Sequence, residues 1–259
     1  MKTLDALKIE VVGEVTSFRY PHFTQGFQPT YEMPPPSTIY GHICSAVGRF
    51  LLPEEVSRLR FAYMFKHAGK FIDYMEHLHF NDPIQPFPFN RELLFQPRLT
   101  LYLTGIDLEQ VFRAPNYMVV LGRSQDLMTY DSVEQVTLTQ VEHGFLEHTL
   151  MPMHMAARLP KNVTVATMAR YIDPQRHPSW QSYALLQDVV EVWPPIVEEA
   201  DEDDPFALDD YGVGSDDMVW AFEGDKDSED LWAEVDGPQH STSGLPRAFW
   251  LHSFTEEAP

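Results

Sequence analysis

This chain of 259 residues has a single cysteine, no long apolar run and no excess of basic residues. Its one cysteine, Cys44, has no partner for an internal disulfide, which is typical of the reducing cytoplasm. No apolar run approaches the ~18 residues of a membrane span, and the first residues lack the apolar segment of a signal peptide. Composition therefore predicts a cytoplasmic protein without a membrane segment, in which Cys44 is buried and unreactive.

The shortage of basic residues is uneven along the chain. Against 39 acidic side chains there are 18 lysines and arginines, a net charge of −21, which weighs against non-specific binding of nucleic acid. Residues 198–259 hold 19 acidic and two basic side chains (−17), so the other 197 residues hold 20 and 16 (−4). A nearly neutral body can still carry a local basic groove. We predict that the acidic stretch 198–237 is a solvated, flexible insertion that does not fold alone.

Motifs for catalysis and for metal or cofactor binding are also absent. There is no GxGxxG, P-loop, HExxH or paired-cysteine motif, and the spacing of His143, His148 and His154 suits neither a helix face nor a strand face. The stretch 122–125, GRSQ, lacks the second glycine of a GxSxG nucleophile elbow. We therefore predict no metal, no cofactor and no catalytic residue from these patterns.

Hydrophobic periodicity predicts an α+β fold. Residues 8–18 alternate as in a half-buried strand, and residues 34–36 are three prolines that lead to a helix capped by Ser37. Within that helix we expect Gly41 and Gly48 to permit the close approach of another backbone. The predicted elements are a strand at 8–18, a helix at 37–52, a strand at 60–66, a proline-rich and aromatic-rich hairpin at about 76–98, a strand at 99–103, a helix at 107–113 and a strand at 117–121.

This order is that of a split βαβ unit, the ferredoxin-like arrangement, with an insertion. Further strands are predicted at 133–141, 163–171, 183–192 and 249–254. We therefore predict a ferredoxin-like domain at residues 1–121 and a smaller β-rich portion at residues 122–259, which contains the acidic insertion.

Residues suited to RNA lie in loops and at strand ends. Arginine forks fit phosphates, and tyrosine rings stack on bases. The sheet itself carries no aromatic RNP strand signature, so bases stacked on an open sheet are not expected. The candidates are Arg19 and Tyr20 after the first strand, Lys66, His67 and Lys70 after the second, Arg91 in the hairpin, and Arg123, Ser124 and Gln125 after residue 121.

Two segments near the first helix resemble a known family. Residues 16–23, TSFRYPHF, lead into residues 34–41, PPPSTIYG, and this pair strongly resembles the CRISPR-associated protein 5 family of the RAMP superfamily. Residues 91–94 (RELL), 121–126 (LGRSQD) and the terminal FWLHSF are also similar to that family. The resemblance spans most of residues 8–192 and looks closest to the type I-B branch.

The resemblance implies a non-catalytic subunit of a type I Cascade surveillance complex that binds and caps the 5′ handle of crRNA. The hairpin at about 76–98 would be a thumb that contacts the neighbouring backbone subunit. Further implied partners are the large subunit of Cascade and, through the complex, target DNA. The implied handle contacts are Arg19, Tyr40, Arg91, Arg123, Ser124 and Gln125.

Two other interpretations remain open from sequence. Some members of the family, in type I-C systems, cut precursor crRNA without a metal by means of a tyrosine, a lysine and a histidine, and Tyr40, Lys66 and His67 are residues of those types. The other interpretation is an acidic protein-interaction module without an RNA role.

Overall fold

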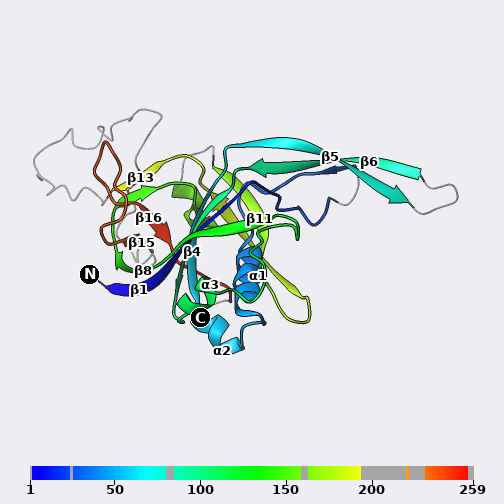
Figure 1. Ribbon diagram of the computed structural model, residues 1–259. Coiled ribbons are helices and arrows are strands. Elements are labelled where there is room, and N and C mark those ends of the chain that lie inside the picture. Colours follow the sequence, from blue (N-terminus) through cyan, green and yellow to red (C-terminus); the bar gives the residue numbers. More distant parts are fainter. Residues whose placement is uncertain are drawn as a thin grey trace, which may run out of the picture.

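A seven-stranded antiparallel sheet forms the centre of the computed structural model (Figure 1). The structure describes residues 2–23, 26–79, 85–158, 163–193, 220–221 and 231–255. The strands, in spatial order, are β16 (Ala248–Trp250), β15 (Leu231–Glu234), β8 (Met128–Gln140), β1 (Thr3–Gly13), β7 (Arg98–Thr104), β4 (Arg60–Lys66) and β17 (His252–Ser253).

The sheet closes on itself through the last strands of the chain. β16 pairs with β15 at one edge and β17 pairs with β4 at the other, although only Leu251 separates β16 from β17. The same extended segment therefore bridges both edges and covers one face of the sheet. Ala6, Ala62 and Tyr102 from that face pack against Phe249 and Leu251. Strands from both predicted portions, 1–121 and 122–259, thus share one sheet.

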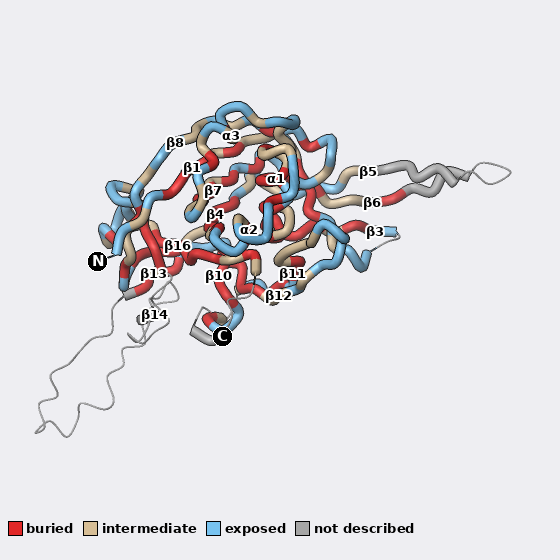
Figure 2. Tube along the Cα trace, turned by 90° about the horizontal axis from the view of Figure 1, so that it is seen from below, coloured by how far each residue is buried: buried red, intermediate tan, exposed pale blue. Residues whose placement is uncertain are grey.

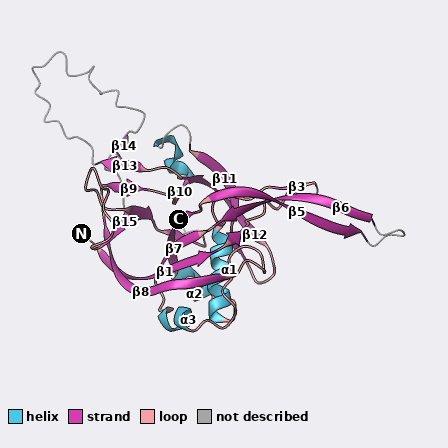
Figure 3. Ribbon diagram, turned by 45° about the horizontal axis from the view of Figure 1, so that its top comes forward, coloured by secondary structure: helices cyan, strands magenta, loops and turns pink. Residues whose placement is uncertain are grey.

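The opposite face of the sheet packs against α1 (Pro36–Val47). Side chains alternate between the two faces of a strand, so Ile9 of β1 and Phe61 of β4 reach the cluster that contains Ile39 and Ile43 of α1. The connections run from β1 through α1 to β4 and from β7 through α3 (Glu109–Arg113) to β8. Figure 2 shows the central strands largely buried, and the predicted α+β class is confirmed, with strands prevailing (Figure 3).

The first helix differs in detail from its prediction. Its N-cap is Pro35, not Ser37, because Pro36 occupies the first helical position, where a missing N–H costs nothing. It ends at Val47 because Gly48 takes a left-handed φ of 85°. A separate helix, α2 (Pro53–Arg58), follows. A side chain at Gly48 would meet Asn116, but nothing lies within 4 Å of a Cβ atom at Gly41. Close approach of another segment therefore explains Gly48 and does not explain Gly41.

The predicted strand at 117–121 is wrong. Only Val120 makes an isolated bridge there, to Leu127, and β8 is the strand that pairs with β1. Asn116 instead donates hydrogen bonds to the carbonyl oxygens of Ala46 and Val47, which fastens this segment to the end of α1. Residues 114–127 therefore form an irregular connection over the helix.

A long hairpin of β5 (Gly69–His79) and β6 (Gln85–Phe95) extends from the body of the molecule in Figure 1. It begins earlier than the predicted start at about residue 76. Near its base β6 also pairs with β2 (Val15–Thr16) and with β3 (Phe27–Gln28).

Two three-stranded sheets complete the described structure, together with the 3-10 helix η1 (Met153–Arg158). One contains β10 (Leu150–Pro152), β12 (Pro178–Leu185) and β11 (Thr164–Ile172), and the other contains β14 (Trp220–Ala221), β13 (Val190–Trp193) and β9 (Gly144–Leu146).

Most of the predicted acidic insertion, 198–237, lies outside the described residues. Leu231 to Glu234 are described, and they form β15 of the main sheet, with Trp232 only 7% exposed. The prediction of a solvated insertion is therefore wrong for Leu231 to Glu234, because the apolar residues of this segment enter the core.

Among the described helices, none has the length and apolar character that a membrane crossing requires. Cys44 is buried as predicted, and burial raises the pKa of its thiol.

Candidate nucleic-acid interface

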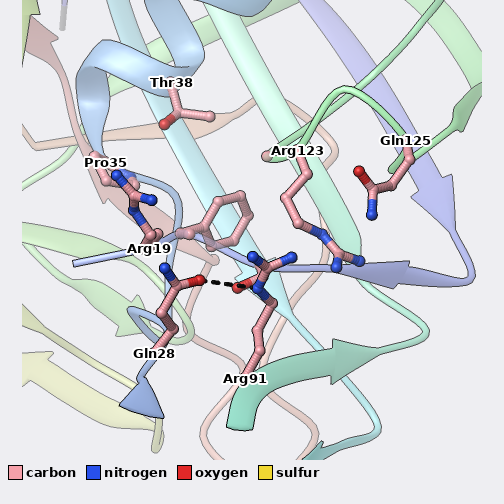
Figure 4. A pocket seen from close by; sticks show the side chains of 10 residues that line it. Arg19, Gln28, Pro35, Thr38, Arg91, Arg123 and Gln125 are labelled. Atoms are coloured by element: carbon pink, nitrogen blue, oxygen red, sulfur yellow. Dashed lines mark hydrogen bonds between the residues drawn. The ribbon is translucent and has the colours of Figure 1, made fainter. Parts of the chain in front are cut away.

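A polar cleft of about 350 Å³ opens where the start of α1, the base of the hairpin and the 122–125 loop meet (Figure 4). Four of the predicted RNA-binding residues, Arg19, Arg91, Arg123 and Gln125, are brought together here from separate parts of the chain. We call this site the arginine cleft. The residues that line it are Ser17, Phe18, Arg19, Gln28, Pro35, Thr38, Arg91, Gly122, Arg123 and Gln125.

Three guanidinium groups gather at the arginine cleft. Burial lowers the pKa of Arg91, and the positive charges of Arg123 and Arg19 lower it further, partly opposed by Asp73. The Arg91 Nε donates a hydrogen bond of 3.0 Å to Gln28 Oε1, which fixes the orientation of the side chain. Because the neighbouring cations repel one another, an anion bound between them would lower the electrostatic energy of the site.

The 122–125 loop is held close to the strand that precedes Arg19. Gly122 adopts a φ of 98°, and a Cβ atom at this position would lie 2.4 Å from Thr16 Oγ1 and 2.8 Å from the carbonyl oxygen of Ser17. Thr16 Oγ1 also donates a hydrogen bond to the carbonyl oxygen of Leu121. Only glycine fits this position without strain, and its presence brings Arg123 to the rim of the cleft.

The N-terminal end of α1 contributes Pro35 and Thr38 to the lining. This end has no side-chain cap, and the helix is 12 residues long. The N-terminal end of a helix carries partial positive charge and favours anions. The helix therefore adds to the electrostatic preference that the arginines create.

Three predicted RNA contacts, Lys70, His67 and Tyr20, interact with other side chains of the protein. Lys70 pairs with Glu32 and also lies 3.7 Å from Glu92, and His67 Nε2 lies 3.3 Å from Glu32. Tyr20 stacks on Tyr31 with 3.7 Å between ring centroids. None of the three lines the cleft, and the acidic partners reduce the attraction of Lys70 and His67 for phosphate.

Two further candidates, Lys66 and Ser124, are exposed but do not line the cleft. Ser124 lies between the lining residues Arg123 and Gln125, at the rim.

The burial of Tyr40 contradicts its predicted role as an RNA contact. Its side chain is 2% exposed and packs edge-on against Tyr171 and Phe254 in the core. Burial and the neighbouring Cys44 and Tyr171 raise the pKa of its hydroxyl. The helical spacing that places Ile39 and Ile43 in the core does the same for Tyr40, so it is not accessible to a splayed base.

Sequence alone missed Gln28, Thr38 and Asp126. Gln28 reaches the site only because β3 runs parallel to β6 and places it opposite Arg91. Asp126 is buried and pairs with Arg123, three residues before it. The close i, i+3 spacing of opposite charges is a pattern visible in sequence; the β3–β6 pairing is not. Within the described residues no group of three metal-ligating side chains comes together.

Comparison with known proteins places the chain among CRISPR-associated proteins. A family model described as CRISPR-associated protein (Cas_Cas5) matches residues 6–148, more than half of the chain. The chain belongs to this family. It is thus a CRISPR-associated protein. No curated protein matches it.

Solved structures resemble the chain at low sequence identity. A chain of a CRISPR RNA-guided surveillance complex has a TM-score of 0.49 and 15% identity, covering 72% of this chain and 89% of that one. A CRISPR protein from Archaeoglobus fulgidus has a TM-score of 0.43 and 12% identity, with 71% and 87% covered. A chain of a type III-B Cmr-beta complex bound to cognate target RNA has a TM-score of 0.45 and 11% identity, with 71% and 86% covered. The assignment to the family rests on the family model.

Proposed function

We propose that this chain is the subunit of a type I Cascade complex that binds and caps the 5′ handle of crRNA, without catalytic activity of its own. The observation that carries the proposal is the convergence of Arg19, Arg91 and Arg123 on one cleft beside the N-terminus of α1. A bent single strand of RNA presents closely spaced phosphates, and arginine forks and a helix N-terminus are the groups that bind them.

The proposed fold is the ferredoxin-like domain of the RAMP superfamily with an inserted thumb. The strand order β8-β1-β7-β4, with α1 and α3 as the connecting helices, supports this assignment. The hairpin of β5 and β6 is the proposed thumb, which would reach the neighbouring backbone subunit. Its exposed apolar side chains, Phe71, Ile72 and Tyr74, suit such a contact. The large subunit, target DNA held by the complex, and the type I-B branch are parts of the same proposal.

The cleft explains how a protein of net charge −21 can bind RNA. Affinity for RNA depends on the positive charges at the contact, not on the total charge. The described part of the cleft lining contains three arginines and no acidic residue, and the one carboxylate paired with a lining arginine, that of Asp126 with Arg123, is buried. Binding would therefore be confined to a few phosphates and would depend on salt accordingly.

The experiment measures the affinity of the purified chain for RNA carrying the 5′ handle over a range of salt concentrations. We expect Arg91→Ala and Arg123→Ala each to weaken binding about tenfold and to lower the slope of log K against log salt by about 0.7, the value for one lost contact with a single strand. Arg58→Ala, at an exposed position of α2 that does not line the cleft, is the control and should behave as wild type.

Unchanged binding by both cleft variants would refute the proposal and favour the acidic protein-interaction module. The endoribonuclease alternative is tested by incubating repeat RNA with the protein in EDTA. Specific cleavage at the handle would establish it. Tyr40 packs against Tyr171 and Phe254, whereas His67 lies against Glu32 and Gly69, and no contact among the described residues joins Tyr40 to His67.

A further inference from the structure

Asp126 connects the loop that carries Arg123 to the strand that precedes Arg19. Its side chain is 2% exposed. Its Oδ2 atom accepts hydrogen bonds from the backbone N–H groups of Arg123, at 2.9 Å, and Ser17, at 3.3 Å. The carboxylate also receives the Arg123 side chain, through Nε at 3.0 Å to each oxygen and Nη2 at 2.6 Å to Oδ1. One buried carboxylate thus holds the loop backbone, the strand and the guanidinium together.

This carboxylate determines where the Arg123 guanidinium lies. In Figure 4 the side chains of Arg91 and Arg123 extend toward one another, although their like charges repel. A free arginine in this position would turn toward solvent. The planar fork of Arg123 is instead bound along its Nε and Nη2 side, so the group stays beside Arg91 before any ligand arrives.

We propose that Asp126 is a positioning residue of the arginine cleft, which prepares Arg123 for a phosphate by holding it in place. This inference rests on the proposed function. Electrostatics alone would predict that removing a negative charge near a site for a polyanion strengthens RNA binding. If positioning prevails, removing the Asp126 charge weakens binding, because the freed arginine must be ordered again when RNA binds.

A matched pair of substitutions separates the two effects. Asp126→Asn and Asp73→Asn each remove one negative charge near the arginines. Asp73 lies on β5 opposite Arg91 of β6 and acts on Arg91 through its charge. We expect Asp126→Asn to weaken binding of 5′-handle RNA about threefold to tenfold. Asp73→Asn should leave affinity unchanged or raise it. Tighter binding by both variants would overturn the proposal.

A double-mutant cycle tests whether Asp126 acts through Arg123. In an Arg123→Ala background the Asp126→Asn substitution should have little further effect on RNA affinity. Equal losses in both backgrounds would mean a general structural role and would contradict the proposal. Arg123→Lys is the second variant, since it keeps the charge and leaves the backbone bonds of Asp126 intact but lacks the fork. It should bind as weakly as Asp126→Asn, and wild-type affinity would overturn the proposal.

Hydrogen exchange of the free protein distinguishes failure of this inference from failure of the proposed function. If the wild-type protein did not bind 5′-handle RNA, the proposed function would be refuted, and the exchange experiment would still test the role of Asp126. The amides of Ser17 and Arg123, which donate to Asp126, should exchange faster in Asp126→Asn and remain protected in Asp73→Asn. Unchanged protection in Asp126→Asn would refute the role of Asp126 as the residue that holds the loop.

Discussion

Substituting alanine for Gly122 should destabilise the protein strongly, because this position combines a forbidden conformation with a close contact. A φ of 98° is rare for any residue with a side chain, and such strain costs about 1–3 kcal/mol. The added methyl group would also lie 2.4 Å from Thr16 Oγ1. Moving that hydroxyl weakens its hydrogen bond to Leu121, which contributes about 1 kcal/mol. The expected loss of unfolding free energy is about 2–4 kcal/mol.

The assay is thermal unfolding followed by circular dichroism, with urea unfolding at one temperature as a second measure. For a chain of this size each kcal/mol corresponds to about 2–4 °C, so the Tm of Gly122→Ala should fall by about 5–15 °C. Gly41→Ala is the matched control. It lies in α1 with open space around the position, so alanine should stabilise the helix by about 1 kcal/mol and raise the Tm.

A Tm of Gly122→Ala within about 2 °C of the wild type, while Gly41→Ala was stabilised as expected, would refute this prediction. In that case the loop would tolerate a side chain at residue 122, and its close approach to Thr16 and Ser17 would not be what places Arg123. A fall in Tm together with weaker RNA binding would connect the loop geometry to the cleft.

Two further predictions concern buried side chains. Tyr40→Phe should leave RNA affinity unchanged and cost less than about 1 kcal/mol of stability, because the buried hydroxyl has no well-formed hydrogen bond among the described residues. Measurements of RNA affinity and of Tm test the two parts. A loss of RNA affinity would contradict the burial of Tyr40. His252 donates to the carbonyl oxygen of Leu150, and burial lowers its pKa to about 4. In the unfolded chain His252 binds a proton more readily than in the folded protein. The contribution of neutral His252 to stability is therefore complete above pH ~6.5 and decreases by about 3 kcal/mol as the pH falls to about 4. Urea unfolding at pH 7 and pH 5 should show a smaller difference for His252→Gln than for wild type, and an equal difference would contradict the assignment.

Local patterns were sufficient for the elements that build the body. Alternation in residues 99–103 predicts β7, and Pro115 correctly places the end of the short helix α3. The proline-rich excursion predicts a hairpin, and its strands are β5 and β6. These features depend on side-chain periodicity and on backbone restrictions of proline, which act between residues close in sequence.

Long-range pairing decided what local patterns missed. Residues 117–121 form a short apolar run that could be a strand, yet the partner of β1 is β8, because β8 offers a much longer antiparallel register. Leu231 to Glu234 belong to an acidic stretch, yet they form a buried strand because β8 and β16 provide neighbours on both sides. Neither outcome is encoded in the residues of the segment alone.

The sequence by itself determined the α+β class, most strands and helices, the family resemblance at the entry to α1, and the residue types able to bind phosphate. Only the tertiary structure selected among those residues. It placed Arg19, Arg91 and Arg123 at one cleft, gave Lys70 an acidic partner, and buried Tyr40. The physical reason is that the capacity of a side chain to bind phosphate depends on its own chemistry. Its exposure, its partners and its direction depend on which distant strands pair and which surfaces are covered.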